Sequence, residues 1–347
     1  MANSLFSFQR FFVFSNIIFF PNISFSQISP FYPISPFSPI SPFYPISPFY
    51  PLSPFSFWLS QTYSLTLQQN QSASFIVYFH MEQFITSLHN PKIKKLLSLQ
   101  QKSSERRKEG LFVVEGQREL AHCVNAGFKV DTLFYCESLI QGNRLDDISS
   151  YVSATTQIIK VSPEVYEKIA YRGTTEGIIA EIIEQKKSLD DLHLSANPLL
   201  AVVEKVEKPG NLGAILRSAD AAAADAVIVC DPLTDLYNPN LIRSSIGAIF
   251  SVPCVACSTE ECIRFLKQKN IRILTAQLQD SHLYYDTDMR SGVAIVMGTE
   301  STGLTDSWRE AADAHIRIPM LGALDSLNVS VSAAILLFEA VRQRNQE

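Results

Sequence analysis

The chain has 347 residues and a formal net charge of −5 at pH 7, which excludes a protein that binds nucleic acid over its whole surface. Its six cysteines do not form the framework of a small secreted domain, so we expect reduced thiols and a cytoplasmic location. Cys254 and Cys257 form a CxxC inside an apolar run, with no second CxxC or His pair to complete a zinc site. We interpret them as core cysteines and expect no metal.

The first 80 residues have a composition of their own. They contain no acidic residue, and Arg10 is their only Lys or Arg, so the remaining residues carry a charge of −6. Residues 28–57 repeat hexapeptides such as ISPFYP, whose prolines exclude helix and sheet and favour a disordered extended chain. The apolar run 11–20 is far shorter than the ~20 residues that span a bilayer, and we expect no membrane partner. We favour a misplaced translation start for residues 1–80; a signal peptide, an organellar transit peptide and a docking peptide are the alternatives.

Strand-like and helix-like segments alternate from residue 81 to residue 184. Residues 90–110 are typical of an amphipathic helix and its exit, with seven Lys or Arg against two Glu. This charge run is either a solvated face or a phosphate-contacting patch. The expected strands are 111–116, 131–136, 156–161 and 176–183, with helices at 117–127 and after Ser162-Pro163. This alternation predicts a small α/β domain.

The polar segment 185–198 is the expected linker, and LLAVVEKV at 199–206 is typical of a strand that is buried on both faces. From there to residue 347 the pattern predicts a parallel sheet with helices on both sides. The expected helices are 211–223, 239–249, 259–270, 305–312 and the C-terminal one, and the expected strands are 225–230, 251–257, 271–279, 293–298 and 315–320.

Polar residues follow three of these strands, at the edge where an open parallel sheet binds its ligands. In the first segment, EKPGNLGAILRSAD (207–220), we expect Asn211 to cap a helix and Gly213 to clear space for Arg217. An arginine there can hold a phosphate or a developing oxyanion, although a surface arginine is the simpler interpretation. In the second, IVMGTESTGL (295–304), Gly298 and Gly303 bracket Glu300 in a bend that brings backbone close to a ligand, or in a simple turn.

The third segment, IPMLGALDSLNVSVSAAILLF (318–338), begins as a strand end that stops at Pro319. Asp325 or Ser326 is the expected cap of the following helix. The first turn is rich in hydroxyls and amides that can either hold a polar ligand or cap the helix. The expected buried stripe of this helix is Leu327, Val331, Ala334, Ile335 and Phe338.

Several common catalytic patterns are absent from the sequence. There is no GxGxxG after the first strand of the second half and no GxxxxGK[ST], which disfavours a nucleotide-dependent enzyme on an ordinary doubly wound sheet. His193 lies in the linker and His315 inside a strand, so neither is placed beside a Ser or Cys nucleophile.

Taken together, NLGAILRSADA, VMGTESTGL and IPMLGALDSLNVSVSAAI resemble, in this order, the three motifs of the SpoU/TrmH family of RNA 2′-O-ribose methyltransferases, in the SPOUT superfamily. The resemblance covers about residues 199–345, and residues 91–184 are similar to the small substrate-binding domain that often precedes it. It implies an α/β fold with a parallel sheet and a C-terminal trefoil knot at 199–347, preceded by an RNA substrate-binding domain at 81–184.

The resemblance also implies a cofactor, a partner and a set of site residues. The cofactor is S-adenosylmethionine and the assembly is a homodimer. Cofactor-binding positions match Gly298, Thr299, Ile318, Met320 and Leu327. The polar active-site positions match Asn211, Arg217, Glu300, Ser326 and Asn328. The basic residues expected to bind RNA are Lys92, Lys94, Lys95, Arg106, Arg107, Lys108 and Arg243.

The implied reaction is methyl transfer from a sulfonium to a ribose 2′-hydroxyl, with ribosomal RNA as the favoured substrate. Arg217 matches the family's proposed base, but an arginine stays charged in proteins. We hypothesise that it binds the adjacent phosphate and stabilises the forming alkoxide, while Glu300 and Asn328 orient Asn211. The alternatives are a transfer-RNA 2′-O-methyltransferase and a catalytically silent RNA-binding paralogue.

Overall fold

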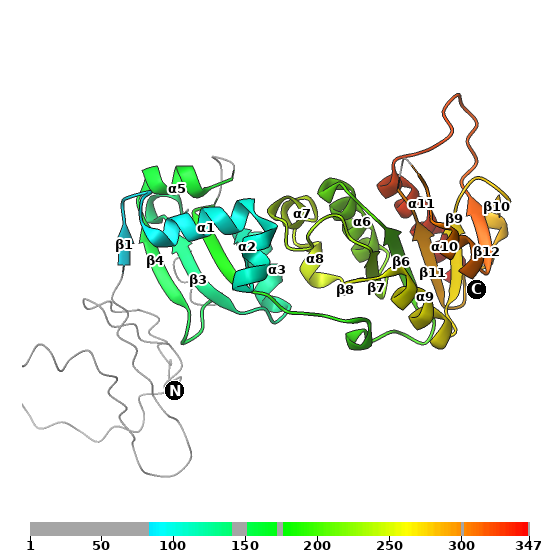
Figure 1. Cartoon of the computed structure of the whole chain (residues 1–347), viewed down its shortest axis with the longest axis horizontal. Coiled ribbons are helices and arrows are strands. Elements are labelled where there is room, and N and C mark those ends of the chain that lie inside the picture. The colour runs from blue at the N-terminus through cyan, green and yellow to red at the C-terminus, as the bar shows by residue number, and fades with distance from the viewer. Residues whose placement is uncertain (1–82, 141–150, 172–175, 300–301, 346–347) are drawn as a thin grey trace, which may run out of the picture. The chain divides into compact units, whose positions relative to one another are not determined.

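The computed structural model describes residues 83–140, 151–171, 176–299 and 302–345, and Gln83–Glu347 forms one compact unit (Figure 1). The predictions for the proline-rich repeat and for the apolar run before it lie outside the described residues. No helix in the described ranges combines the length and the apolar character that crossing a bilayer requires.

The part of this unit before residue 184 is built on a five-stranded sheet of order β1-β4-β3-β5-β2. Strand β5 runs antiparallel to β2 and β3, whereas β1, β4 and β3 run parallel to one another. The strands are β1 (Gln83–Ile85), β2 (Leu111–Glu115), β3 (Val130–Tyr135), β4 (Gln157–Val161) and β5 (Ile178–Ile183). The α-helices are α1 (Pro91–Gln101), α2 (Ser103–Glu109), α3 (Gln117–Asn125) and α5 (Pro163–Ile169). The predicted alternation is confirmed, and β1 is an edge strand that the pattern did not indicate.

The single helix predicted over 90–110 is in fact two helices, because the backbone of Lys102 is extended (φ −120°, ψ 117°). Asn90 caps α1 through its side-chain oxygen, and Gly110 ends α2 in the left-handed region (φ 63°), where glycine has no Cβ penalty. Helix α5 begins as predicted, with the Ser162 hydroxyl accepting from the backbone of the first turn.

The part from residue 199 onward is built on a seven-stranded sheet of order β10-β12-β9-β11-β6-β7-β8 (Figure 1). All neighbouring strands run parallel, so the predicted parallel sheet is confirmed. The strands are β6 (Leu199–Glu204), β7 (Ala226–Cys230), β8 (Cys254–Cys257), β9 (Arg272–Ala276), β10 (His282–Leu283), β11 (Val293–Met297) and β12 (Ala314–Arg317). The short edge strand β10 was not predicted.

Helices cover both faces of this sheet. They are α6 (Pro209–Ala221), α7 (Pro239–Ser244), α8 (Ala248–Ser251), α9 (Thr259–Gln268), α10 (Asp306–Ala311) and α11 (Val329–Arg344). Successive strand residues point to opposite faces, so Ala201 of β6 packs in the core of α6 and α11 while Val202 packs in the core of α9 and α10. The helix predicted near 239–249 is split into α7 and α8 because Ile246 and Gly247 have left-handed backbones (φ 54° and 82°).

The buried stripe predicted for the last helix is wrong. Val331 and Phe338 are each 46% exposed, whereas α11 packs on the sheet and on α6 through a different stripe. That buried stripe is Ala333, Leu336, Leu337 and Ala340. Both sets follow the helical repeat, because α11 is apolar around most of its circumference, so periodicity alone could not select the core face.

Candidate functional site

The three motif segments emerge at one edge of the seven-stranded sheet. Strands β6 and β11 are parallel neighbours, with Val203 beside Met297, so the loops that follow them leave side by side. The third segment follows β12, and it returns to α11, which packs against α6, β6 and β11. The expected convergence of the three segments is therefore confirmed for the described residues.

A side-chain hydrogen bond joins the first motif to the third. Asn328 Nδ2 donates to Asn211 Oδ1 at 3.2 Å. Asn328 Oδ1 accepts from the backbone N–H of Ser330 at 3.0 Å and from its hydroxyl at 2.6 Å. Because the Asn328 oxygen is used as the cap of α11, its amide nitrogen must face Asn211. The start of α11 thus holds the start of α6.

Two predicted helix caps are wrong in position. Helix α6 begins at Pro209 with Lys208 at the N-cap, so Asn211 lies inside the first turn with its side-chain oxygen directed to Asn328. The pyrrolidine of Pro209 explains the shift, because proline is favoured in the first helical position. The cap of α11 is Asn328 itself, while the predicted cap Ser326 is exposed and donates to Asp325 Oδ1 at 3.3 Å.

Gly213 does not clear space beside Arg217. A Cβ at Gly213 would lie 2.1 Å from Ser244 Oγ and 2.8 Å from the Ser244 carbonyl carbon, so this glycine permits the close contact between α6 and α7. Arg217 lies one turn further along α6, is exposed, and makes no hydrogen bond or ion pair with another described residue. Its guanidinium is available to a ligand from solvent.

The loop after β11 is closed by its own backbone. Thr299 and Gly303 exchange two backbone hydrogen bonds of 3.3 and 3.1 Å, and Thr302 N–H donates to Thr299 Oγ1 at 3.0 Å. A Cβ at Gly298 would lie 2.2 Å from the carbonyl carbon of Gly303, so only glycine permits this closure. The prediction for Glu300 lies outside the described residues.

The segment between β12 and α11 is extended, and Figure 1 shows it reaching away from the sheet. Ile318 and Met320 are half-buried, whereas Leu327 is 37% exposed. Within the described ranges the backbone of 318–327 forms no backbone–backbone hydrogen bond. A ligand can therefore hydrogen-bond to the backbone of this segment.

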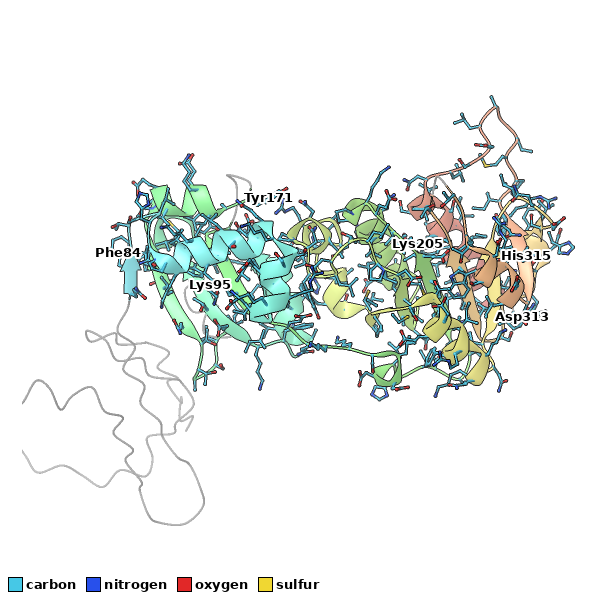
Figure 2. All side chains as sticks on the ribbon, viewed as in Figure 1. Phe84, Lys95, Tyr171, Lys205, Asp313 and His315 are labelled. Carbon is cyan, nitrogen blue, oxygen red and sulfur yellow. The ribbon has the colours of Figure 1, made fainter. Side chains whose placement is uncertain are left out.

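Glu204 is a residue of this edge that the sequence analysis missed. It is the last residue of β6, is 2% exposed, and precedes the left-handed turn at Lys205 (φ 52°; Figure 2). Its carboxylate accepts from Thr305 N–H at 2.9 Å, from Thr305 Oγ1 at 2.7 Å and from Thr259 Oγ1 at 3.2 Å. It fixes the end of the second motif to β6. The sequence did contain an indication of this role, because Glu204 is a single acidic residue at the end of an otherwise apolar strand.

The predicted RNA-binding residues are in different environments. Arg106 is 5% exposed, with Nε on Asp235 Oδ2 at 2.6 Å and Nη1 on the Leu99 carbonyl at 2.6 Å. Arg243 lies 3.7 Å from Glu115 Oε2 and stacks on the Tyr171 ring at 4.0 Å. The Arg106 guanidinium is thus buried and held by the chain, whereas Arg243, on α7 and outside the charge run, keeps a partly exposed side chain. Contact of either with RNA stays a prediction.

The remaining lysines and arginine of the charge run are at the surface. Lys95 of α1 pairs with Glu181 at 2.8 Å, and Lys108 pairs with Glu109 at 3.2 Å (Lys95 is labelled in Figure 2). Lys92 Nζ donates to Gln157 Oε1 at 2.7 Å. The exposed residues of the charge run with no ion pair to another described residue are Lys94, Lys102 and Arg107, and Lys102 was not among the predicted RNA-binding residues.

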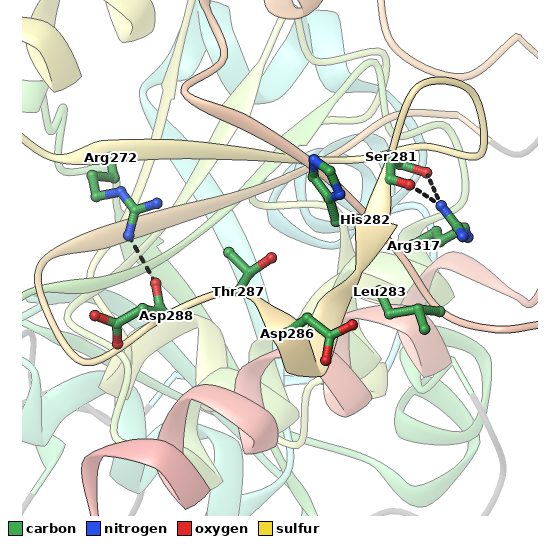
Figure 3. A pocket seen from close by; sticks show the side chains of 8 residues that line it. All are labelled: Arg272, Ser281, His282, Leu283, Asp286, Thr287, Asp288 and Arg317. Carbon is green, nitrogen blue, oxygen red and sulfur yellow. Dashed lines mark hydrogen bonds between the residues drawn. The ribbon is translucent and has the colours of Figure 1, made fainter.

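A cavity of ≈ 530 Å³ lies beside β10 and η6 (Tyr284–Asp286) but contains none of the predicted residues (Figure 3). Arg272 Nη1 donates to the Asp288 carbonyl at 2.8 Å, and Arg317 donates to the Ser281 carbonyl. Both guanidinium groups are thus held by the chain itself. The cavity touches the predicted site only through Arg317, which directly precedes Ile318.

Comparison with known proteins agrees with this arrangement. Residues 198–338 match the SpoU rRNA Methylase family, and residues 90–180 match the MRM3-like substrate binding domain. The 23S rRNA (guanosine-2′-O-)-methyltransferase RlmB of Vibrio vulnificus is 35% identical over 234 residues, which span 64% of this chain and 95% of that protein. The chain belongs to the SpoU methylase family.

Two further proteins match this chain over most of their length. The 23S rRNA (uridine(2479)-2′-O)-methyltransferase of Streptomyces viridochromogenes is 29% identical over 273 residues, covering 75% of this chain and 92% of that one. The AdoMet-bound crystal structure of an rRNA methyltransferase from Sinorhizobium meliloti superposes with a TM-score of 0.69 at 28% identity, covering 75% of this chain and 97% of that chain.

Proposed function

We propose that this chain transfers a methyl group from S-adenosylmethionine to a ribose 2′-hydroxyl of ribosomal RNA. The observation that carries the proposal is the Asn328–Asn211 hydrogen bond, which joins two motifs of a SpoU methylase at the ligand edge of the sheet. The relatives named for 23S rRNA favour ribosomal over transfer RNA.

The residues of this edge fit S-adenosylmethionine. Backbone donors and acceptors of 318–327 are unused by backbone partners within the described ranges, and half-buried Ile318 and Met320 offer apolar contacts for a base. Gly298 and Thr299 present a loop end with no bulky side chain. We assign Gly298, Thr299, Ile318, Met320 and Leu327 to the cofactor, and the trefoil knot that would shape this loop stays a prediction.

When bound, this cofactor supplies an electrophilic methyl group on a sulfonium. The chain's own residues must align the 2′-hydroxyl and stabilise its oxygen as the proton leaves, and alignment alone contributes several kcal/mol. Exposed Arg217 binds the neighbouring RNA phosphate and the forming alkoxide as a permanently charged guanidinium, and the proton leaves to water or a neighbouring group. Asn211, whose side-chain oxygen accepts from Asn328, is oriented by this bond toward the ribose. Ser326 and Glu300 complete the polar set.

We divide the chain into a substrate-binding domain at 81–184, a linker at 185–198 and a methyltransferase domain at 199–347, with residues 1–80 as an extension. The match to a substrate binding domain at 90–180 supports the first part. Lys94 and Arg107 are the residues of the charge run best placed for RNA phosphates, with Lys92, Lys95 and Lys108 as secondary contacts.

We infer that the protein acts as a homodimer in the cytoplasm. Val331 and Phe338 are half-exposed along α11, and Leu321 and Leu324 of the preceding segment are 96% and 76% exposed. Exposed apolar side chains along one helix and the segment before it fit a contact with a second copy. The six free cysteines fit a reducing compartment.

The test is the transfer of labelled methyl from S-adenosylmethionine to total RNA by the full-length protein. We expect label in ribosomal RNA, abolished by Arg217→Ala and retained by Arg264→Ala, a control at an exposed position of α9. Label in transfer RNA alone would overturn the substrate, and cofactor binding without label in any RNA would favour the silent paralogue.

A further inference from the structure

Three cysteines that are far apart in the sequence lie together at the C-terminal end of two strands. Cys230 is the last residue of β7, Cys257 is the last residue of β8, and Cys262 lies on α9. Their Sγ atoms all lie within 4.8 Å of one another. Cys230 and Cys257 are direct neighbours in the register of the parallel strands, so the sheet itself holds two of the three sulfurs.

The CxxC of the sequence does not mark this group. Cys254 and Cys257 are three residues apart in one strand, so their side chains point to opposite faces of the sheet. Cys254 is buried in the core that includes α6, whereas Cys230 and Cys262 are buried in the core that includes α9 and α10. The relevant spacing is the C-x4-C of Cys257 and Cys262, which the turn into α9 brings together with Cys230.

The geometry of the three sulfurs suits a thiophilic metal. With Zn–S bonds of ~2.3 Å, sulfurs at the corners of a tetrahedron lie about 3.8 Å apart, so the group needs to close by at most about 1 Å. Cys230 and Cys262 are fully buried, while Cys257 is partly exposed and provides a route for an ion from solvent. Thiolate ligands select zinc and copper(I) over hard cations.

We propose that Cys230, Cys257 and Cys262 bind one thiophilic d10 cation, zinc(II) or copper(I). Binding replaces three S–H protons by three metal–sulfur bonds, the protons pass to solvent, and no atom changes its oxidation state. Among the described residues no fourth His, Cys, Asp or Glu joins the group. Copper(I) is complete with three thiolates, whereas zinc takes a water as its fourth ligand.

The bound ion links α9 to the sheet next to the proposed methyltransfer edge. Thr259, in the first turn of α9, donates to Asp231 Oδ2 at 2.7 Å and to Glu204 Oε1 at 3.2 Å. Glu204 in turn holds Thr305, which follows the second motif. An ion at the three thiolates would therefore stabilise the start of α9 and, through these hydrogen bonds, the end of that motif.

The test uses the full-length protein, reduced and stripped of metal, titrated anaerobically with cadmium(II) as a spectroscopic substitute for zinc and, separately, with copper(I). We expect one ion per chain, with a sulfur-to-cadmium absorption band in the ultraviolet. Cys262→Ser should weaken binding by more than the ~100-fold that loss of an outer-shell partner costs. Competition between zinc and copper(I) then assigns the ion.

Cys254→Ser is the matched control, because it removes a buried thiol from the same strand as Cys257 but from the opposite face. It should bind like the natural protein. A second measurement needs no variant: the metal should protect Cys257 from alkylation. The proposal is overturned if neither ion binds stoichiometrically, if Cys254→Ser and Cys262→Ser lose binding equally, or if the metal gives Cys257 no protection.

Discussion

Asn328 and Asn211 are 117 positions apart in the chain, and one amide hydrogen bond of 3.2 Å joins them. The same Asn328 side chain caps α11 through its oxygen. One residue thus sets both where α11 begins and how the Asn211 amide is oriented. These two roles can be separated by substitution.

Asn328→Asp keeps the cap, because aspartate is as good an N-cap as asparagine, but it places a carboxylate oxygen against Asn211 Oδ1. We expect the free energy of unfolding to change by less than ~1 kcal/mol while methyl transfer falls about tenfold or more. Asn238→Asp at the cap of α7 is the matched control and should leave transfer unchanged. Equal transfer by natural and Asn328→Asp protein would contradict the orienting role.

Arg217→Lys tests whether a guanidinium is required. A lysine keeps the positive charge but loses the planar pair of donors, so we expect kcat to fall about 100-fold with a smaller change in the KM for RNA. Steady-state rates at varied RNA concentration measure both. Near-normal turnover would show that Arg217 supplies charge only.

Gly298→Ala tests the closed loop after β11. The new Cβ would lie 2.2 Å from the Gly303 carbonyl carbon, so the loop must open, and we expect affinity for S-adenosylmethionine to fall about tenfold or more. Calorimetric titration measures it. Gly210→Ala, where a Cβ meets nothing within 4 Å, should bind the cofactor normally; if both variants bind normally, the closed loop does not shape the cofactor site.

Glu181 gives the fold a pH dependence that can be measured. Burial raises the pKa of its carboxyl above the usual value, and the ion pair with Lys95 offsets this only in part. Because the Glu181 carboxyl has a higher pKa in the folded than in the unfolded protein, its protonation stabilises the fold. This contribution is complete below the pKa of the unfolded state and is lost as the pH rises through the pKa of the folded state. Glu181→Gln should therefore gain stability relative to the natural protein from pH 4 to pH 7. Denaturant unfolding at several pH values checks this, and a constant difference would contradict it.

Phe338→Glu tests the proposed homodimer. A charge in the middle of the exposed stripe of α11 should shift the protein from dimer to monomer in light scattering without changing its helix content. Glu310→Lys on α10 is a surface control. If the natural protein is a monomer at micromolar concentration, the proposed homodimer is wrong.

The sequence predicted the sheet strands well because continuous apolar runs such as 199–204 have few alternatives in a parallel sheet. Prediction from the sequence failed where one local pattern is compatible with two structures. The apolar residues of α11 allow two stripes, and only the packing on α6 buries the one with Leu336. The burial of Arg106 within the charge run could not be predicted either, because its partner Asp235 lies far along the chain.

The convergence of the motifs was predicted because parallel strands end at one edge, but the individual contacts were not. Gly213 packs on Ser244, and the group of Cys257 with Cys230 depends on strand register. Such contacts join residues that are distant in sequence, so local periodicity contains no information on them.

Alkaline hydrolysis of ribosomal RNA labelled by the protein tests directly whether the methyl group is on a ribose oxygen. A 2′-O-methyl group blocks cleavage of the adjacent phosphodiester, so we expect the label in alkali-resistant dinucleotides. Label recovered in mononucleotides would place the methyl group on a base and rule out ribose methylation.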